Sequence, residues 1–209
     1  MTDPAERRRA IRDGYDTIAG GYDRERARDP PEMALIERFA DRLEPGACVL
    51  DAGCGGGEPV GRFLSERFDL VALDFSRAQL ELARSRLPDS LLLAGDLVSL
   101  PFADGNFDAI CAAYAVIHVP REQHRDCFEE FRRVLRPGGL LLVTVGTADW
   151  TGTNDDWMGF GAAMHWSSPG PERTSELLSV VGFDVLWERH VGDGVSERDG
   201  EHVFVLARA

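Results

Sequence analysis

Hydrophobic residues along the chain fall into two alternating patterns. Short continuous apolar runs, bounded by glycine, proline or acidic residues, are typical of strands that are buried on both faces. Between these runs, apolar residues recur at every third or fourth position, which predicts amphipathic helices. The strands predicted in this way are Cys48–Asp51, Leu70–Asp74, Leu91–Ala94, Phe107–Ala113 and Leu140–Val145.

The helical pattern occupies the segments around these strands. Asp29-Pro30-Pro31 separates two helices at the N-terminus, and Pro137-Gly138-Gly139 is expected to end a later one. Alternation of strands and helices requires a parallel sheet covered by helices on both faces. The predicted helices are two within 4–43, one around Val60–Leu64, one beginning at a capping box at Ser76, one over 121–136 and one around Glu172–Val181.

The pattern changes at the C-terminus. Phe183–Val191 and His202–Ala207 are predicted strands joined by a short polar loop that contains glycine, which is typical of a hairpin. A hairpin makes one strand antiparallel to the rest. The predicted fold is therefore α/β: a doubly wound, Rossmann-like sheet of seven mostly parallel strands with a C-terminal antiparallel hairpin.

Thr147–Gly170 is the longest stretch without a regular pattern. It contains Trp150, Trp157 and Trp166, three of the four tryptophans of the chain. An irregular segment of this length inside a compact domain is usually functional or disordered, and its aromatic content favours a functional segment. We expect it to lie on the substrate side.

A glycine-rich segment follows the first predicted strand. Asp51-Ala52-Gly53-Cys54-Gly55-Gly56-Gly57 predicts a tight turn whose bare backbone lets a ligand approach closely. Asp74 ends the next strand, at the position where doubly wound folds bind the hydroxyls of a ribose. Together these features predict a cofactor that carries a nucleoside.

The glycine spacing restricts the kind of cofactor. The dinucleotide fingerprint G-x-G-x-x-G needs a third glycine at position 58, where this chain has Glu58. A carboxylate there also repels a pyrophosphate, which argues against an NAD-type oxidoreductase. The pattern D-x-G-x-G-x-G instead resembles motif I of the class I S-adenosylmethionine (AdoMet)-dependent methyltransferases, and AdoMet has no phosphate.

The resemblance extends over most of the chain, to small-molecule methyltransferases of the domain 11/25 type. Leu73-Asp74-Phe75-Ser76 is similar to motif II, Gly95-Asp96-Leu97 to motif III and Phe107-Asp108-Ala109-Ile110 to the start of motif IV. Tyr15-Asp16 through Tyr22-Asp23 resembles a segment that caps the cofactor in that family. The resemblance implies an enzyme that binds AdoMet, releases S-adenosylhomocysteine and uses no metal. The cofactor-binding residues that it implies are Tyr22, Asp51, Gly53, Cys54, Gly55, Gly57, Asp74, Phe75, Asp96, Leu97, Ala113 and Tyr114.

The resemblance also assigns roles within this set. Asp74 is expected to accept hydrogen bonds from both ribose hydroxyls, and Asp96 one from the adenine amino group. Phe75 would pack on the adenine, while Ala113 and Tyr114 would line the methionine side. Each acid has a simpler explanation as a cap of the following turn or helix, and Phe75 as a core residue. Tyr22 is equally explained as an ordinary residue on a helix face.

Two histidines are candidates for catalysis. His118 follows the fourth predicted strand, at the carboxyl edge of the sheet where ligands bind, and it is predicted to contact substrate or to act as a base. His165 lies beside Trp166 in the irregular segment and is the second candidate. A structural histidine hydrogen-bonded to a loop explains His118 equally well.

Charge constrains the partners. The 209 residues carry 36 acids and 23 bases, all of them arginine, for a net charge of −13. Such a field repels nucleic acid and anionic membranes, so we expect a small-molecule substrate with an O, N or C acceptor atom. The lysine-free, acidic composition resembles that of salt-adapted proteins, although biased codon usage also replaces lysine with arginine.

The remaining expectations concern organisation and location. The four cysteines show no metal-ligand spacing, so free thiols in a reducing cytoplasm are expected. We expect one domain over 1–209, built from a helical cap (1–43), a cofactor-binding core (44–146), the substrate-side segment (147–170) and a helix with the hairpin (171–209). A non-catalytic module that binds AdoMet as a partner subunit is the alternative to an enzyme.

Overall fold

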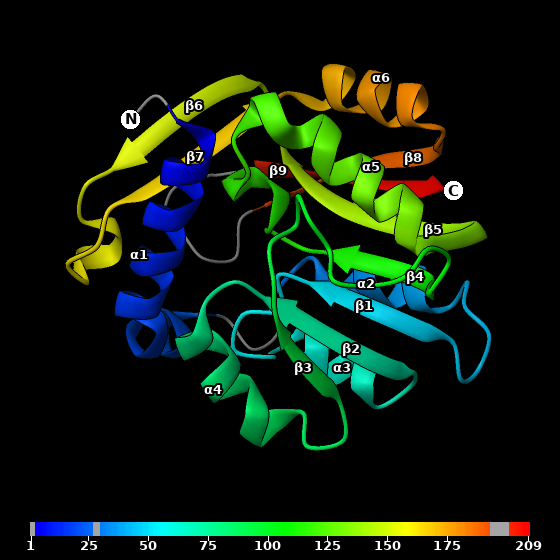
Figure 1. Cartoon of the computed structure of the whole chain (residues 1–209), viewed down its shortest axis with the longest axis horizontal. Coiled ribbons are helices and arrows are strands. Elements are labelled where there is room, and N and C mark those ends of the chain that lie inside the picture. Colours follow the sequence, from blue (N-terminus) through cyan, green and yellow to red (C-terminus); the bar gives the residue numbers. More distant parts are fainter. Residues whose placement is uncertain (1–2, 27–29, 193–200) are drawn as a thin grey trace.

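The computed structural model describes residues 3–26, 30–192 and 201–209. A seven-stranded sheet runs through the centre, with helices on both of its faces (Figure 1). The N-terminal helix and a separate two-stranded hairpin lie together beyond one end of the strands. The helices, with 3-10 helices marked η, are α1 (Pro4–Glu25), α2 (Met33–Ala40), α3 (Val60–Ser65), α4 (Arg77–Arg86), η1 (Val116–His118), η2 (Arg121–Gln123), α5 (His124–Val134), η3 (Trp157–Gly159) and α6 (Pro171–Val181).

The strand order of the large sheet is β3-β2-β1-β4-β5-β9-β8. Strands β1 to β5 pair in parallel, whereas β9 runs antiparallel to both β5 and β8. This topology confirms the predicted doubly wound fold with its C-terminal hairpin. The loop predicted between the last two strands falls at 193–200, outside the described residues. The strands are β1 (Cys48–Ala52), β2 (Asp69–Asp74), β3 (Leu91–Ala94), β4 (Phe107–Ala112), β5 (Leu135–Gly146), β6 (Asp149–Asn154), β7 (Met164–Pro169), β8 (Asp184–Gly192) and β9 (Glu201–Arg208).

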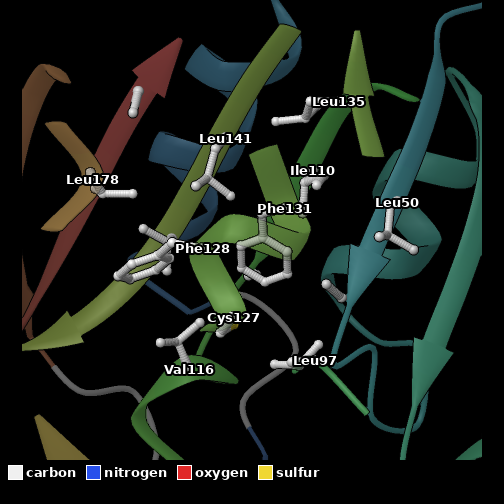
Figure 2. Packing of buried hydrophobic residues seen from close by; sticks show 14 of the residues in the cluster. Leu50, Leu97, Ile110, Val116, Cys127, Phe128, Phe131, Leu135, Leu141 and Leu178 are labelled. Carbon is white, nitrogen blue, oxygen red and sulfur yellow. The ribbon is translucent and has the colours of Figure 1, made fainter. Parts of the chain in front are cut away.

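Two hydrophobic clusters fix the helices to the sheet. Helices α5 and α6 cover one face, where Phe128 and Phe131 of α5 pack with Leu50, Ile110 and Leu141 of the strands (Figure 2). Helices α2, α3 and α4 supply the cluster on the other face. Because both faces are covered, the parallel strands are mostly apolar, which is the pattern that predicted them.

The boundary between α5 and β5 differs from the prediction. The helix ends at Val134 and β5 begins at Leu135, so Pro137-Gly138-Gly139 lies within the strand rather than ending the helix. A residue before proline disfavours helical backbone, which stops the helix early. The extended segment is then held by the chain terminus, because Gly138 N–H donates to the Ala209 carbonyl at 2.7 Å.

The segment Thr147–Gly170 is not irregular, which corrects the prediction. It forms the antiparallel hairpin of β6 and β7, with Asp149 opposite Pro169 and Asn154 opposite Met164. Strand β6 lacks the alternation of apolar and polar residues that would have revealed it. Its Trp150 ring lies so close to the neighbouring Gly152 that an added Cβ would come within 2.0 Å of that ring.

Helix α1 packs on this hairpin rather than on the sheet. Ile11 and Ile18 of α1 are buried in one cluster with Met164 of β7. Gly14 and Gly21, seven residues apart on the same side of α1, allow the close approach, because a Cβ on Gly21 would meet the Phe160 ring at 2.9 Å. The helix is therefore held at the carboxyl ends of the strands. None of the helices in the described ranges has the length and apolar content that crossing a membrane requires.

Candidate functional site

The glycine loop after β1 forms the floor of a cleft at the carboxyl ends of the strands. Gly53 has φ +88° and Gly55 φ +53°, both in the left-handed region that favours glycine. The N–H groups of Gly53 and Cys54 donate to the Leu73 carbonyl, which fixes the loop to β2. A Cβ on Gly53 would lie 2.4 Å from the Ala115 Cβ, so only glycine fits there.

Asp74 stands at the end of β2, beside this loop. One carboxylate oxygen accepts from Gly55 N–H and the other from Ser76 N–H, each at 2.8 Å. The side chain is buried, and burial raises the pKa of Asp74 to about 6 even though both hydrogen bonds favour the charged form. Because two N–H groups hold it, the carboxylate has one fixed orientation toward the cleft that it lines.

Asp51, at the end of the adjacent strand β1, is also buried. Its Oδ2 has no hydrogen-bond partner among the described residues. Burial raises the pKa of Asp51 to about 7, and the nearby Arg26 opposes this rise. A buried acceptor without a donor is costly, so this carboxyl group has spare capacity to accept a hydrogen bond or to pair with a positive charge.

The cleft between the strand ends and α1 has a volume of about 970 Å³, its open mouth included. The structure brings twelve of the fourteen predicted site residues to its walls. Gly57 and His165 are outside it; a Cβ on Gly57 would contact Leu87 at 3.1 Å, so this glycine serves the packing of α4. The predicted residues that line the cleft are Tyr22, Asp51, Gly53, Cys54, Gly55, Asp74, Phe75, Asp96, Leu97, Ala113, Tyr114 and His118.

Helix α1 covers the cleft, and it carries the two Tyr-Asp pairs, Tyr15-Asp16 and Tyr22-Asp23. Tyr15 and Tyr22 line the cleft, with their rings 5.7 Å apart in a T-shaped arrangement. Asp16 accepts from the Ser76 hydroxyl at 2.6 Å and from Ala78 N–H at 3.1 Å. The tyrosines therefore face the cleft, whereas Asp16 attaches the helix to the start of α4.

His118 is joined to α1 by a hydrogen bond. Its Nε2 lies 2.9 Å from the Tyr15 hydroxyl, and its Nδ1 lies 3.0 Å from the His165 carbonyl. Burial lowers the pKa of His118 to about 4, so the ring is neutral at pH 7. A carbonyl can only accept, which places the proton on Nδ1 and makes Nε2 the acceptor for the Tyr15 hydroxyl.

Comparison with known proteins agrees with this arrangement. The family described as "Methyltransferase domain" matches residues 50–143, which include the glycine loop and both acidic strand ends. A demethylmenaquinone methyltransferase from Paenarthrobacter aurescens is 38% identical over 135 residues, or 62% of this chain and 52% of that protein. Residues 50–143 therefore carry a methyltransferase domain of the class I AdoMet-dependent type.

Other similarities cover more of this chain or are to proteins named for different acceptors. A tRNA (carboxymethyluridine(34)-5-O)-methyltransferase from Arabidopsis thaliana is 29% identical over 165 residues, covering 72% of this chain and 39% of that protein. The solved structure of Burkholderia thailandensis 1,6-didemethyltoxoflavin-N1-methyltransferase, with bound 1,6-didemethyltoxoflavin and S-adenosylhomocysteine, shares the fold with a TM-score of 0.76. That match is 19% identical and covers 100% of this chain and 91% of the other. The chain spans about half the length of the first curated relatives it matches.

Other residues line the cleft without being among the predicted site residues, and Tyr15, Arg8 and Arg26 are three of them. Tyr15 was visible only as part of the Tyr-Asp pattern, where its heptad spacing from Tyr22 places both rings on one helix face. Arg8 and Arg26 also line the cleft. Neither arginine stands in a motif of its own, so only the packing of α1 over the strand ends reveals them.

The second catalytic candidate, His165, lies on strand β7 of the hairpin. Its side chain is paired with Thr153, whose hydroxyl is 2.9 Å from Nδ1, and it faces a neighbouring pocket beside Arg7. Its backbone carbonyl, rather than its ring, contacts His118. Any effect of His165 on the cleft would therefore pass through the orientation of His118.

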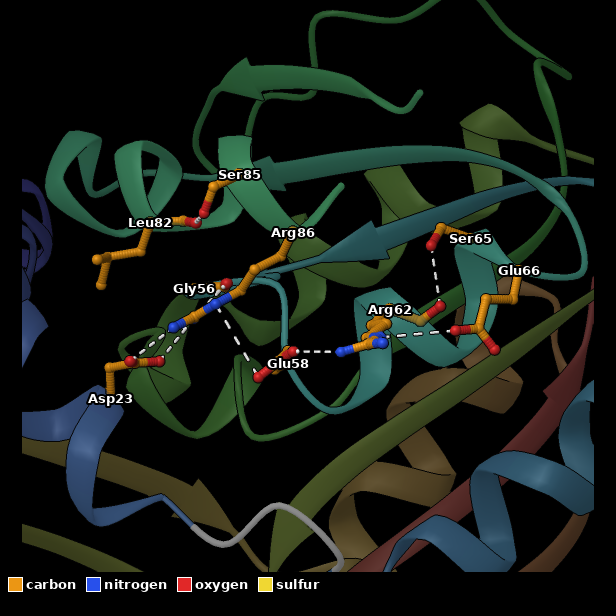
Figure 3. Close-up of polar contacts among 9 residues, drawn as sticks. All are labelled: Asp23, Gly56, Glu58, Arg62, Ser65, Glu66, Leu82, Ser85 and Arg86. Carbon is orange, nitrogen blue, oxygen red and sulfur yellow. Dashed lines mark hydrogen bonds and ion pairs between the residues drawn. The ribbon is translucent and has the colours of Figure 1, made fainter. Parts of the chain in front are cut away.

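The negative charge of Glu58, which was expected to repel a pyrophosphate, is partly neutralised by neighbouring arginines. Its carboxylate lies 3.1 Å from Arg62 and 4.0 Å from Arg86 (Figure 3). Repulsion of a pyrophosphate is weaker than predicted, because two cations share this charge. The missing third glycine remains, and the family match now supplies the stronger argument against a dinucleotide site.

Proposed function

We propose that this chain is an AdoMet-dependent methyltransferase that acts on a small molecule, at an O, N or C atom. One observation carries the proposal: a bare glycine loop lies between two buried carboxylates at the ends of adjacent strands. A ribose offers hydroxyl donors and a methionine offers an ammonium group, and buried carboxylates bind both kinds of donor.

The cleft residues fit the polar parts of AdoMet. Asp74 would accept hydrogen bonds from the two ribose hydroxyls, and the Asp51 carboxylate would accept one from the methionine ammonium group. Arg26 would pair with the methionine carboxylate, since its buried Nε has no partner among the described residues. Its guanidinium already donates to the Tyr22 hydroxyl at 2.7 Å, which keeps it beside the cleft.

The adenine would occupy the other end of the cleft. Phe75 and Leu97 would pack against its faces, and Asp96 would accept from its amino group. Arg8 donates to Asp96 at 2.7 Å and so fixes this carboxylate from α1. Ala113 and Tyr114 would line the methionine side, where Tyr114 has the strained φ of +56° that often marks a functional position.

Bound AdoMet supplies a methyl group that is already activated on a cationic sulfonium. The chain would contribute alignment, closeness and exclusion of water, which can supply most of the barrier reduction. For an O–H or N–H acceptor, a proton must also leave. We propose that it moves to the Tyr15 oxygen while the Tyr15 proton passes to Nε2 of His118, whose orientation the His165 carbonyl fixes.

The acidic surface supports a small-molecule acceptor. A net charge of −13 opposes binding to a polyanion, although a relative from Arabidopsis thaliana is named as a tRNA methyltransferase. A non-catalytic AdoMet-binding module is not favoured, because the matched relatives are named as enzymes. A cytoplasmic location and adaptation to high salt are part of the proposal; four free thiols and the lysine-free, acidic composition support them.

The cofactor assignment predicts selective stabilisation by S-adenosylhomocysteine. At concentrations about 100-fold above its Kd, this product should stabilise the native state by about 2.7 kcal/mol and raise Tm by several degrees. NAD(H) should leave Tm unchanged. Stabilisation by NAD(H) alone would disprove the cofactor assignment, and release of S-adenosylhomocysteine from AdoMet with a metabolite extract would separate an enzyme from a binding module.

Cofactor affinity should depend on pH through the two buried carboxyl groups. The pKa of Asp74 is about 6 and that of Asp51 about 7, and donors from the ligand favour the charged form of both. Binding should therefore release protons, so the Kd of S-adenosylhomocysteine should rise as pH falls from 8 to 5. Calorimetry in buffers of different ionisation enthalpy measures this release; a Kd independent of pH over this range would contradict it.

The raised pKa values of Asp74 and Asp51 have the opposite effect on the stability of the protein without ligand: here stability falls as pH rises. A carboxyl group whose folded pKa exceeds its unfolded value of 3.8 adds stability below that value and loses it as pH rises through the folded pKa. The free energy of unfolding without ligand should therefore fall between about pH 4 and 7 through these two groups. Bound S-adenosylhomocysteine should reduce this loss.

A further inference from the structure

Arg86, the last residue of α4, connects three segments around the cleft. Its guanidinium forms a bidentate ion pair with Asp23 of α1: Nη1 and Nη2 each donate to one carboxylate oxygen at 2.7 Å (Figure 3). Nη1 also donates to the Gly56 carbonyl at 2.8 Å. One side chain thus joins α4, the C-terminal part of α1 and the glycine loop.

The ion pair between Arg86 and Asp23 is largely shielded from solvent. The side chains of Arg86 and Asp23 are 19% and 17% exposed, and a bidentate pair shielded from water is stronger than a surface pair. A Cβ on Gly56 would lie 2.8 Å from Nη1 and 3.2 Å from the Asp23 carboxylate. The second G of the Gly55-Gly56-Gly57 run therefore makes room for Arg86, a role the motif pattern does not indicate.

The two segments that Arg86 joins form opposite walls of the cleft. Gly53, Gly55 and Gly56 line it from the loop. Tyr22 and Asp23 line it from the C-terminal end of α1, as does Arg26, which follows the helix. A ligand held between these walls is retained for as long as they stay together. Arg86 itself does not line the cleft, so it can act only through the segments that it holds.

We propose that Arg86 is a positioning residue for methyl transfer. Its contacts with Asp23 and Gly56, called the latch below, hold α1 against the glycine loop and thereby keep the cofactor in the cleft. The proposal rests on the proposed function. Lysine cannot replace arginine here, since a single ammonium group cannot reproduce the bidentate pair with Asp23 together with the bond to Gly56.

Stopped-flow measurement of S-adenosylhomocysteine dissociation tests the latch. Arg86→Lys, Arg86→Gln and Asp23→Asn should each raise the dissociation rate on the order of tenfold, with little change in the association rate. The double variant Asp23→Asn/Arg86→Gln should dissociate no faster than the faster single variant, because both changes remove one interaction.

Arg62→Gln is the matched control. Arg62 also pairs with Glu58 beside the glycine loop, but it is 62% exposed and contacts neither α1 nor Gly56 (Figure 3). This variant should keep the wild-type rates. Wild-type dissociation rates in Arg86→Lys and Asp23→Asn would overturn the latch, as would additive effects in the double variant, whereas a wild-type protein that does not bind S-adenosylhomocysteine would overturn the proposed function.

Thermal unfolding without ligand distinguishes the latch from a purely structural ion pair. If Arg86 positions α1 over the cofactor, Arg86→Lys should lower the Tm of the complex more than that of the free protein. Equal losses of Tm with and without S-adenosylhomocysteine would mean that the pair stabilises only the fold, and would overturn the proposal.

Discussion

Asp74→Ala will weaken binding of S-adenosylhomocysteine by more than about tenfold, because a buried carboxylate loses two charge-assisted hydrogen bonds to the ribose. Each factor of ten corresponds to about 1.4 kcal/mol. Asp74→Asn should fall between wild type and Asp74→Ala, since one amide oxygen remains as an acceptor. Isothermal titration calorimetry gives the three dissociation constants directly.

Asp69→Ala is the matched control for this change. Asp69 begins the same strand, β2, at the end far from the cleft, and its side chain is exposed. This variant should bind S-adenosylhomocysteine as the wild type does. Asp74 also holds Gly55 and Ser76 in the free protein, so Tm without ligand should be measured for each variant. An unchanged Kd in a folded Asp74→Ala protein would refute the role of Asp74.

Gly53→Ala will destabilise the fold and prevent cofactor binding. The new methyl group would lie 2.4 Å from the Ala115 Cβ, which belongs to a one-carbon side chain that cannot rotate away. Left-handed backbone costs alanine about 1–2 kcal/mol, and the overlap adds about 1–3 kcal/mol. For a chain of this size the sum corresponds to a loss of Tm of roughly 4–20 °C, measurable by calorimetry.

Gly46→Ala isolates the steric part of that effect. Gly46 has a φ of +77°, similar to that of Gly53, but nothing lies within 4 Å of its added Cβ. This variant should lose only the backbone contribution, about 2–8 °C, and should bind S-adenosylhomocysteine normally. If Gly53→Ala and Gly46→Ala had equal stability and affinity, the close approach of the loop to Ala115 would have no energetic consequence.

The sequence predicted the parts of the site that depend on local pattern. Buried parallel strands must be continuously apolar, so their ends, and with them Asp51 and Asp74, can be found from the chain alone. The glycines of the loop stand next to such an end. For the same reason the order of strands and helices sufficed for the predicted sheet, including the antiparallel β9.

The contacts made by α1 could not be predicted in this way. Tyr15 and His118 are 103 residues apart in the chain, and Asp23 and Arg86 are 63 apart. Their pairing depends on how α1 lies on the hairpin of β6 and β7, and β6 was itself missed because its residues do not alternate. Propensity describes a strand poorly when its stability comes from packing on another element.

The position of the nucleoside is the central claim, and a crystal structure of the protein with S-adenosylhomocysteine tests it most directly. We expect both ribose hydroxyls within about 2.5–3.0 Å of the Asp74 carboxylate, with the adenine beside Phe75 and the amino acid part over the glycine loop. A ribose bound anywhere else, or side chains of the protein filling the cleft in its place, would contradict the account.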